Sequence, residues 1–295
     1  MDNTEITDPL FREAVEAIDR GHTALLERLL TEHPELVRER LSLPGGGYFK
    51  DPFLLWFVAD NPIRVPQLPS NIAAIAGLLI EHIKLQGTTT LQEQLDYALG
   101  LVATGRIPKE CGVQTEMMDL LIDAGAKPGG ALGALAHGNV SAAVHLIDRG
   151  GLLTFAAAIG LERMDDVNRL AVTAGEEERL TALTVASFYG KPHWISLLLD
   201  MGVDPNGYPG KESGFHWHAT PLHQAVSSGS LDAVKLLVAA GARLDARDRL
   251  YEGTPLGWAQ HMQTQEGIDA AARKKYERIG EYLGEWGTVL PIDAI

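Results

Sequence analysis

The sequence predicts an all-α fold built from stacked helical hairpins, and two observations carry this prediction. Residues 220–225 and 254–259 share the pattern Thr-Pro-Leu-x-x-Ala, 34 positions apart (220 to 254). Glycines also recur 12 positions apart, at 138 and 150, at 190 and 202, and at 229 and 241. A fixed period of this kind indicates repeated units, each of which buries its apolar face against its neighbours.

Each copy of the Thr-Pro-Leu pattern is expected to open a helix. The Thr hydroxyl can accept a hydrogen bond from an unpaired backbone N–H of the first turn, and Pro loses no hydrogen bond at the first helical position. In the first copy, Gly229 marks a turn and Gly241 a helix stop, with an apolar run between them. Residues 220–241 therefore predict a helix, a tight turn and a second helix.

Residues 219–248 resemble the ankyrin repeat, and the chain as a whole resembles a bacterial-type member of that family with degenerate N-terminal repeats. The resemblance rests on these residues: Ala219-Thr220-Pro221-Leu222-His223, Gly229, Val234-Lys235-Leu236-Leu237 and Gly241-Ala242. It implies two antiparallel helices and a projecting β-hairpin loop per unit, stacked into a curved solenoid. It also implies that the loops line the concave side and contact partners.

The same reading extends along the whole chain as one solenoid domain, residues 1–295. The expected units are residues 8–40, 51–83, 91–125, 131–151, 152–175, 180–204, 219–245 and 253–286. Closing glycines at 125, 150, 175, 202 and 241 are unevenly spaced, so the connections rather than the hairpins vary in length.

Apolar spacing supports the earlier units in turn. In the first, Phe11, Val15 and Ile18 lie at helical intervals before a turn at Gly21. The second has a buried helix over residues 53–58, a proline-marked connection over 62–69 and a partner helix with Ile72, Ile75, Leu78 and Leu79. In the third, Leu95, Ala98 and Leu99 precede Met117, Met118 and Leu121. The charged last helix, around residues 273–281, fits a terminal unit with a polar outer face.

Composition excludes several classes of protein. The net charge of −14 opposes a general phosphate-backbone binder and would favour a basic partner. The single cysteine, Cys111, excludes an intramolecular disulfide and is expected to be a small buried filler. The first residues lack a secretory pattern, and apolar stretches such as residues 72–80 are too short to cross a bilayer. A cytoplasmic protein without a membrane segment is expected.

The longest insertion between well-formed hairpins, residues 208–218, is the most informative candidate for a binding site. Its glycines and its proline favour a turn-rich loop. Exposed aromatic residues there would be binding anchors, because Trp and Tyr supply a large contact area at low conformational cost. The alternative is that Phe215 and Trp217 fold back over the hairpin below.

The preferred function is a non-enzymatic protein-interaction scaffold without a cofactor, which binds another protein through its concave face and the 208–218 loop. The expected partner-binding residues are Phe188, Tyr189, Tyr208, Phe215, His216, Trp217, His218, Gln224, Tyr251 and His261. Trp258 is expected to be mostly structural, and one of Phe188 and Tyr189 to face solvent. An inhibitor or immunity-type protein would be one form of this binding function.

An enzyme or a small-ligand or metal-binding protein is the alternative. His216, His218 and His223 suggest a metal site, because imidazole is a common zinc ligand, but no Cys or clear carboxylate companion accompanies them. Residues 45–50 are glycine-rich but lack the ending of a nucleotide-binding loop. The acidic clusters at residues 165–166 and 176–178 are read as solvated helix ends.

Overall fold

The computed structural model describes residues 5–43 and 47–289, with the side chains of residues 212 and 287–289 left undescribed. It forms two compact units, Met1–Leu152 and Leu153–Ile295. The described residues are helical and contain no strand, apart from one isolated bridge between Gly130 and Leu152. The predicted all-α fold is confirmed. Residues 45 and 46 of the glycine-rich segment lie outside the described residues.

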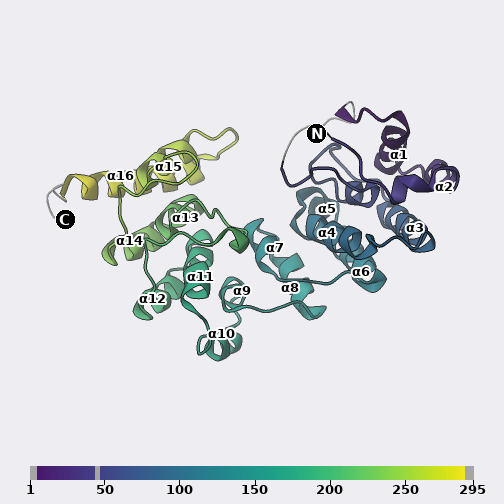
Figure 1. The fold of residues 1–295 in the computed structure, drawn as a ribbon. Coiled ribbons are helices and arrows are strands. Elements are labelled where there is room, and N and C mark those ends of the chain that lie inside the picture. Colours follow the sequence, from purple (N-terminus) through teal and green to yellow (C-terminus); the bar gives the residue numbers. More distant parts are fainter. Residues whose placement is uncertain (1–4, 44–46, 290–295) are drawn as a thin grey trace. The chain divides into compact units, whose positions relative to one another are not determined.

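The first unit consists of helix pairs that follow one another along the chain (Figure 1). Its helices are α1 (Pro9–Asp19), α2 (Thr23–Glu32), η2 (Pro34–Val37), η3 (Leu54–Ala59), α3 (Ile72–Leu85), α4 (Leu91–Thr104), α5 (Arg106–Glu110), α6 (Gln114–Ala124), α7 (Leu132–Ala136) and α8 (Val140–Asp148). One row of contacts runs through α1, η3, α4 and α7, and a second through α2, α3, α6 and α8.

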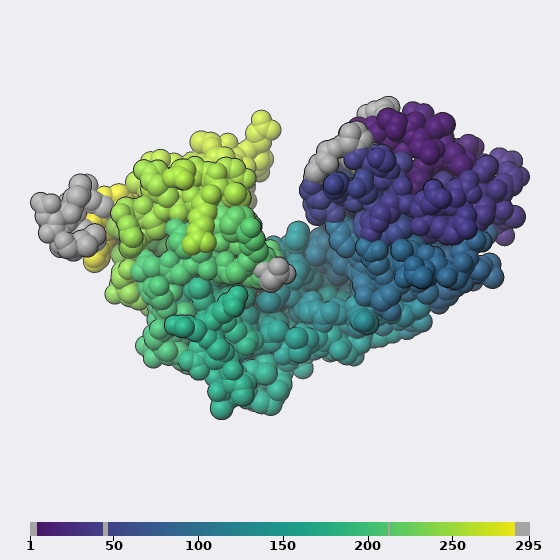
Figure 2. Space-filling model, viewed as in Figure 1, coloured from purple at the N-terminus to yellow at the C-terminus, as the bar shows by residue number. Residues whose placement is uncertain are grey.

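The second unit repeats this arrangement. Its helices are α9 (Phe155–Gly160), α10 (Met164–Leu170), α11 (Glu176–Phe188), α12 (Pro192–Asp200), η4 (Lys211–Ser213), α13 (Pro221–Ser228), α14 (Leu231–Ala239), α15 (Pro255–Gln263) and α16 (Ala270–Val289). The first helices of the pairs, α9, α11, α13 and α15, pack side by side, and so do α12, α14 and α16. In Figure 2 the surface of this unit changes from teal through green to yellow as successive pairs stack.

Burial explains the two rows. Two of the first helices show extensive burial: every residue of α9 from Phe155 to Ile159 is buried, as is the stretch 181–187 of α11. The second helices bury only one face; α14, for example, buries Ala233, Val234, Leu237 and Val238. A helix that lies between two neighbours and its own partner must be apolar on most sides, whereas an outer helix needs one stripe.

Most of the predicted glycine turns adopt the left-handed backbone that favours glycine. Gly229 has φ 72° and Gly241 has φ 89°, and φ is also positive at the glycines 125, 138, 150, 190 and 202. Gly175 is the exception. It is the extended N-cap residue of α11, with φ −74°, so its interpretation as a closing glycine is wrong. Within the same predicted unit, the turn between α9 and α10 has a non-glycine residue with positive φ, Glu162 at 55°.

Three local predictions also need correction. The buried helix expected over residues 53–58 is the 3₁₀-helix η3, and the short helix α5 lies between the two helices of the third predicted unit. The loop 208–218 contains the 3₁₀ turn η4 rather than a β-hairpin. Cys111 is half-buried at the C-terminal cap of α5. In the described part of the chain, no helix is both long and apolar enough for a bilayer.

The first unit encloses a charged cluster at the end of η3. The Arg64 guanidinium lies 2.8 Å from Asp19 Oδ1 and 3.6 Å from Asp60 Oδ1, and all three side chains are nearly inaccessible to solvent. Asp60 Oδ1 also accepts hydrogen bonds from the backbone N–H groups of Arg64 and Val65. Burial raises the pKa of Asp60, against the opposing effect of the Arg64 charge.

Candidate functional site

The loop before α13 folds back onto its own unit. Phe215 is only 4% exposed, and its ring meets Phe188 edge-on at a centroid distance of 5.1 Å. Ser213 is buried as well. Trp217 remains half-buried, with Lys211 Nζ 4.8 Å from its ring. Phe215 therefore anchors the loop, and the alternative in which it folds back is the correct one.

The next connection, residues 241–254, is organised by the fully buried carboxylate of Asp248. Its Oδ1 accepts hydrogen bonds from the backbone N–H groups of Leu250 and Tyr251. Its Oδ2 accepts hydrogen bonds from the backbone N–H of Gly253 and from the indole N–H of Trp258. Burial alone would raise the pKa of Asp248, but these donors outweigh it and lower the pKa to about 2. A buried carboxylate with this many N–H donors stays charged and fixes the shape of its loop.

Side chains join the two connections to each other. The Asn206 amide donates to Gly241 O and accepts from the Arg243 N–H, and the Tyr208 hydroxyl donates to Arg247 O over 2.7 Å. The backbone N–H of Arg249 donates to His218 O. Because main-chain groups of both connections are used, the two loops hold each other's conformation.

The imidazoles near these loops are used for structure. His223 Nε2 lies 3.0 Å from Gly253 O and its Nδ1 faces Thr220, while His218 Nδ1 lies 3.2 Å from Asp248 Oδ1. His216 is exposed and packs edge-on against Trp258. Among the described residues, no group of three or more His, Cys, Asp or Glu side chains is arranged to hold a metal ion. The geometry gives the metal alternative at His216 and His218 no support.

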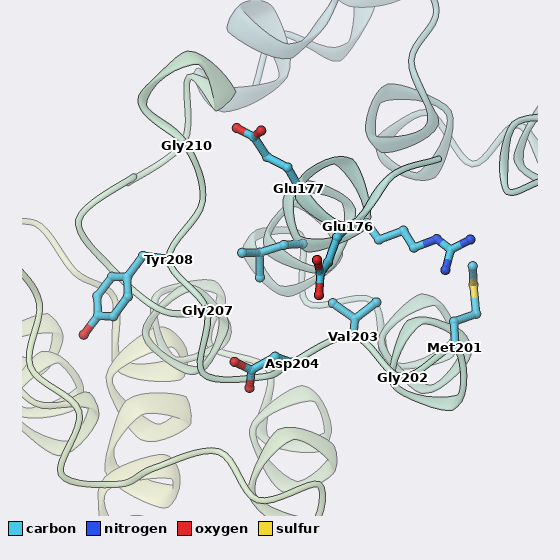
Figure 3. Close-up of a pocket in the computed structure, with 11 residues that line it drawn as sticks. Glu176, Glu177, Met201, Gly202, Val203, Asp204, Gly207, Tyr208 and Gly210 are labelled. Atoms are coloured by element: carbon cyan, nitrogen blue, oxygen red, sulfur yellow. The ribbon is translucent and has the colours of Figure 1, made fainter. Parts of the chain in front are cut away.

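A pocket of about 630 Å³ opens beside the loop (Figure 3). Its walls are the start of α11 with Glu176, Glu177, Arg179 and Leu180, the residues after α12 from Met201 to Asp204, and the loop residues Gly207, Tyr208 and Gly210. Figure 3 shows Glu176 above Val203, and Glu177 on the side of Gly210. Glu176, Glu177 and Asp204 outnumber the cation Arg179 in this lining and give the pocket an acidic wall.

Two glycines allow the loop to approach α11 closely enough to form this pocket. A Cβ atom at Gly207 would lie 2.6 Å from Leu180 Cδ2, and one at Gly210 would lie 2.7 Å from Glu177 Oε1. Distances this short exclude a larger side chain unless the neighbour moves. The sequence of the loop therefore sets the depth of the pocket.

The structure separates the predicted partner-binding residues into three groups by burial. Phe215, His218 and Gln224 are buried, and the Gln224 amide donates to His216 O, so these three support the loop rather than present surface to a partner. Residues Phe188, Tyr189, Tyr208 and Trp217 are half-buried, and His216, Tyr251 and His261 are exposed. Phe188 and Tyr189 are both half-buried, which corrects the expectation that one of them faces solvent.

Glu176 and Glu177 are exposed in the first turn of α11, as the interpretation of a solvated helix end predicts, but the sequence does not show that they also line the pocket. Glu178 Oε1 accepts the backbone N–H of Phe155. The role of Asp248 was also missed. Asp248 accepts the backbone N–H groups two and three residues after it, which is the geometry of an Asx turn, but the sequence alone does not distinguish this Asp from an ordinary surface residue.

Comparison with known proteins gives one match to a family model. The model described as ankyrin repeats (3 copies) matches residues 134–248. No curated protein matches the chain. Two solved structures align with it: the human ASB11 ankyrin repeat domain, at 17% identity and a TM-score of 0.33, over 70% of this chain and 94% of that chain; and the ankyrin repeat domain of Bcl-3, a member of the IkappaB family, at 18% identity and a TM-score of 0.31, over 92% and 98%.

Proposed function

We propose, on the premise that residues 134–248 match a family model of ankyrin repeats, that this chain is a non-enzymatic scaffold that binds another protein. Its contact surface is formed by residues 201–218 and 241–254 of the second unit, with His261 on α15 beside them. The supporting observation is that these two connections are joined through Asn206 and Tyr208 and leave a shaped pocket at their side. A preformed surface loses little conformational entropy when a partner binds.

The acidic wall of the pocket favours a basic side chain of the partner. Three carboxylates, from Glu176, Glu177 and Asp204, and one cation, Arg179, line a space of about 630 Å³, which is acidic on balance and large enough for a Lys or Arg side chain. The net charge of −14 would also attract a positively charged partner during encounter. Tyr208, His216, Trp217 and Tyr251 would supply apolar contact around this polar centre.

The wider organisation is part of the same proposal. We propose that the eight helix pairs of residues 1–295 form a single array, that the protein is cytoplasmic, and that it uses neither a cofactor nor nucleic acid. The helix pairs that alternate in two rows within each unit support the array. The acidic charge supports the absence of a nucleic-acid partner.

Affinity capture from the native cell with the full chain, followed by calorimetry with the purified partner, tests this function. A triple variant, Glu176→Gln, Glu177→Gln and Asp204→Asn, removes the acidic wall. We expect it to weaken binding at least tenfold, because the charge complementarity of the pocket is lost. Raised salt should weaken the native complex and have less effect on the variant.

The matched control neutralises three exposed carboxylates elsewhere in the same unit: Asp165→Asn, Glu277→Gln and Glu281→Gln. It removes the same charge and should leave affinity within about twofold, since surface substitutions away from an interface have small effects. Equal loss in both triple variants would show that only net charge matters. Unchanged binding in the pocket variant would place the contact surface elsewhere.

A further inference from the structure

The connection 241–254 has as many acidic as basic side chains, but its exposed residues next to Asp248 include two arginines, and its charge there differs from that of the neighbouring pocket. We use the name fingertip for Arg247, Arg249, Leu250 and Tyr251, the exposed residues on either side of Asp248. Two of them are cationic in a chain with a net charge of −14. Tyr208 contacts both regions. It lines the acidic pocket, and the Arg249 guanidinium lies 3.9 Å from the centre of its ring.

The apolar part of the fingertip is unusually exposed and at the same time fixed. Tyr251 is 77% exposed and Leu250 is 52% exposed. Their backbone N–H groups nevertheless donate to the buried Asp248 Oδ1, over 2.7 and 3.0 Å. Adjacent exposed apolar residues on an ordered backbone indicate a contact site, because the cost of ordering the loop is already met within the free protein.

The cationic part is available to an acidic ligand. Arg247 donates to the Glu252 backbone oxygen, and the flat face of the Arg249 guanidinium rests on Tyr208. Neither side chain forms an ion pair within the described part of the chain. A guanidinium held by its face keeps its N–H edge free to bind a carboxylate in a bidentate manner.

We propose that the fingertip binds an acidic peptide segment of the partner, in which a carboxylate pairs with Arg249 and a neighbouring apolar side chain packs on Tyr251 and Leu250. This inference rests on the proposed function and adds the chemistry of the partner segment at this position. The partner then presents opposite charges to two adjoining surfaces, a basic side chain to the pocket and an acidic segment to the fingertip. Such a pattern fixes the orientation of the bound partner.

The experiment uses a display library of random linear 12-residue peptides selected on the immobilised full chain. Enriched peptides are synthesised and their affinities measured by fluorescence anisotropy. We expect them to carry Asp or Glu next to an apolar residue. Arg249→Glu and Tyr251→Ala should each reduce the affinity of such peptides at least tenfold, since one reverses the charge and the other removes the apolar contact.

Two exposed residues of the same unit serve as controls, Arg273→Glu for charge and Val172→Ala, at a side chain 82% exposed, for apolar area. Both should leave peptide affinity within about twofold. Circular dichroism melting of each variant establishes that the fold is intact. The fingertip residues are exposed, so we expect no loss of stability from either substitution.

The inference is overturned if no peptide is enriched, if the enriched peptides lack carboxylates, or if acidic peptides bind Arg249→Glu and Tyr251→Ala as they bind the native chain. The proposed function has a separate readout in the captured protein partner. Partner binding that is lost in the pocket triple variant and kept in both fingertip variants would leave the proposed function standing and remove this inference.

Discussion

Asp60 in the first unit and Asp248 in the second are both buried carboxylates that hold a loop, yet their pKa values move in opposite directions. Asp60 accepts two backbone N–H groups through one oxygen and relies on Arg64 for the rest, and burial raises its pKa. Asp248 uses both oxygens, and its N–H donors lower its pKa to about 2. N–H donors on both oxygens therefore outweigh burial and keep Asp248 charged, whereas at Asp60 the effect of burial is the larger one.

Removing the cation of the first unit should give the largest effect. Arg64→Met keeps much of the side-chain volume but leaves Asp60 buried without its cation. We expect the unit to lose about 3–5 kcal/mol of stability, the cost of breaking a buried ion pair on one side. Hydrogen exchange of residues 54–65 measures the loss. Protection equal to that of the native chain would mean that Arg64 contributes little.

The same conservative substitution should affect the two aspartates differently. In Asp248→Asn, either orientation of the amide turns its NH₂ group toward two N–H donors, which predicts a loss of about 2–4 kcal/mol. In Asp60→Asn, Oδ1 can still accept from Arg64 and Val65, and the NH₂ group replaces an oxygen without a hydrogen-bond partner among the described residues. We expect a loss below about 1.5 kcal/mol there. Equal losses in exchange experiments on the two units would contradict the comparison.

These residues also mark the limit of what the sequence can predict. Periodic apolar residues and glycine spacing predicted the helix pairs, because packing and left-handed turns impose a repeat. Asp60, Arg64 and Asp248 lie in irregular connections, where a single charged residue resembles an ordinary surface residue. The burial of Phe215 and Gln224 depended on how the loop folded back, and the pocket depended on the contact of Gly207 with Leu180. No local pattern specifies such long-range approaches.

Asp60 and Asp248 should contribute to the pH dependence of stability with opposite signs. The pKa of Asp248 is lowered in the folded state, so its stabilisation of about 2 kcal/mol is present above the ordinary Asp pKa and is lost as pH falls from about 4 to about 2. The pKa of Asp60 is raised, so its contribution to stability declines as pH rises through that raised value. Urea unfolding across this pH range, followed separately in each unit, checks both. Asp248→Asn and Asp60→Asn should each remove the part of the slope that the replaced aspartate contributes, while the other carboxylates with lowered pKa values keep theirs.

The smallest expected effect tests one donor to Asp248. Trp258→Phe removes the indole N–H that donates to Asp248 Oδ2 and keeps most of the ring area. We expect a loss of about 1–1.5 kcal/mol and a rise in the pKa of Asp248, because one hydrogen bond to the charged form is gone. Hydrogen exchange of residues 248–263 and NMR titration of the Asp248 carboxyl carbon measure the two effects. An unchanged pKa would show that the backbone donors alone determine it.

His223 joins one helix pair to the next through a defined tautomer. Its Nδ1 accepts the backbone N–H of Thr220 at the start of α13, so the ring proton must lie on Nε2, which donates to Gly253 O just before α15. The two hydrogen bonds of the ring therefore constrain the offset between two consecutive helix pairs. If α15 slid along α13 by a single residue, one end of this imidazole would lose its partner, so a side chain buried for structural reasons also fixes the stagger of the stack.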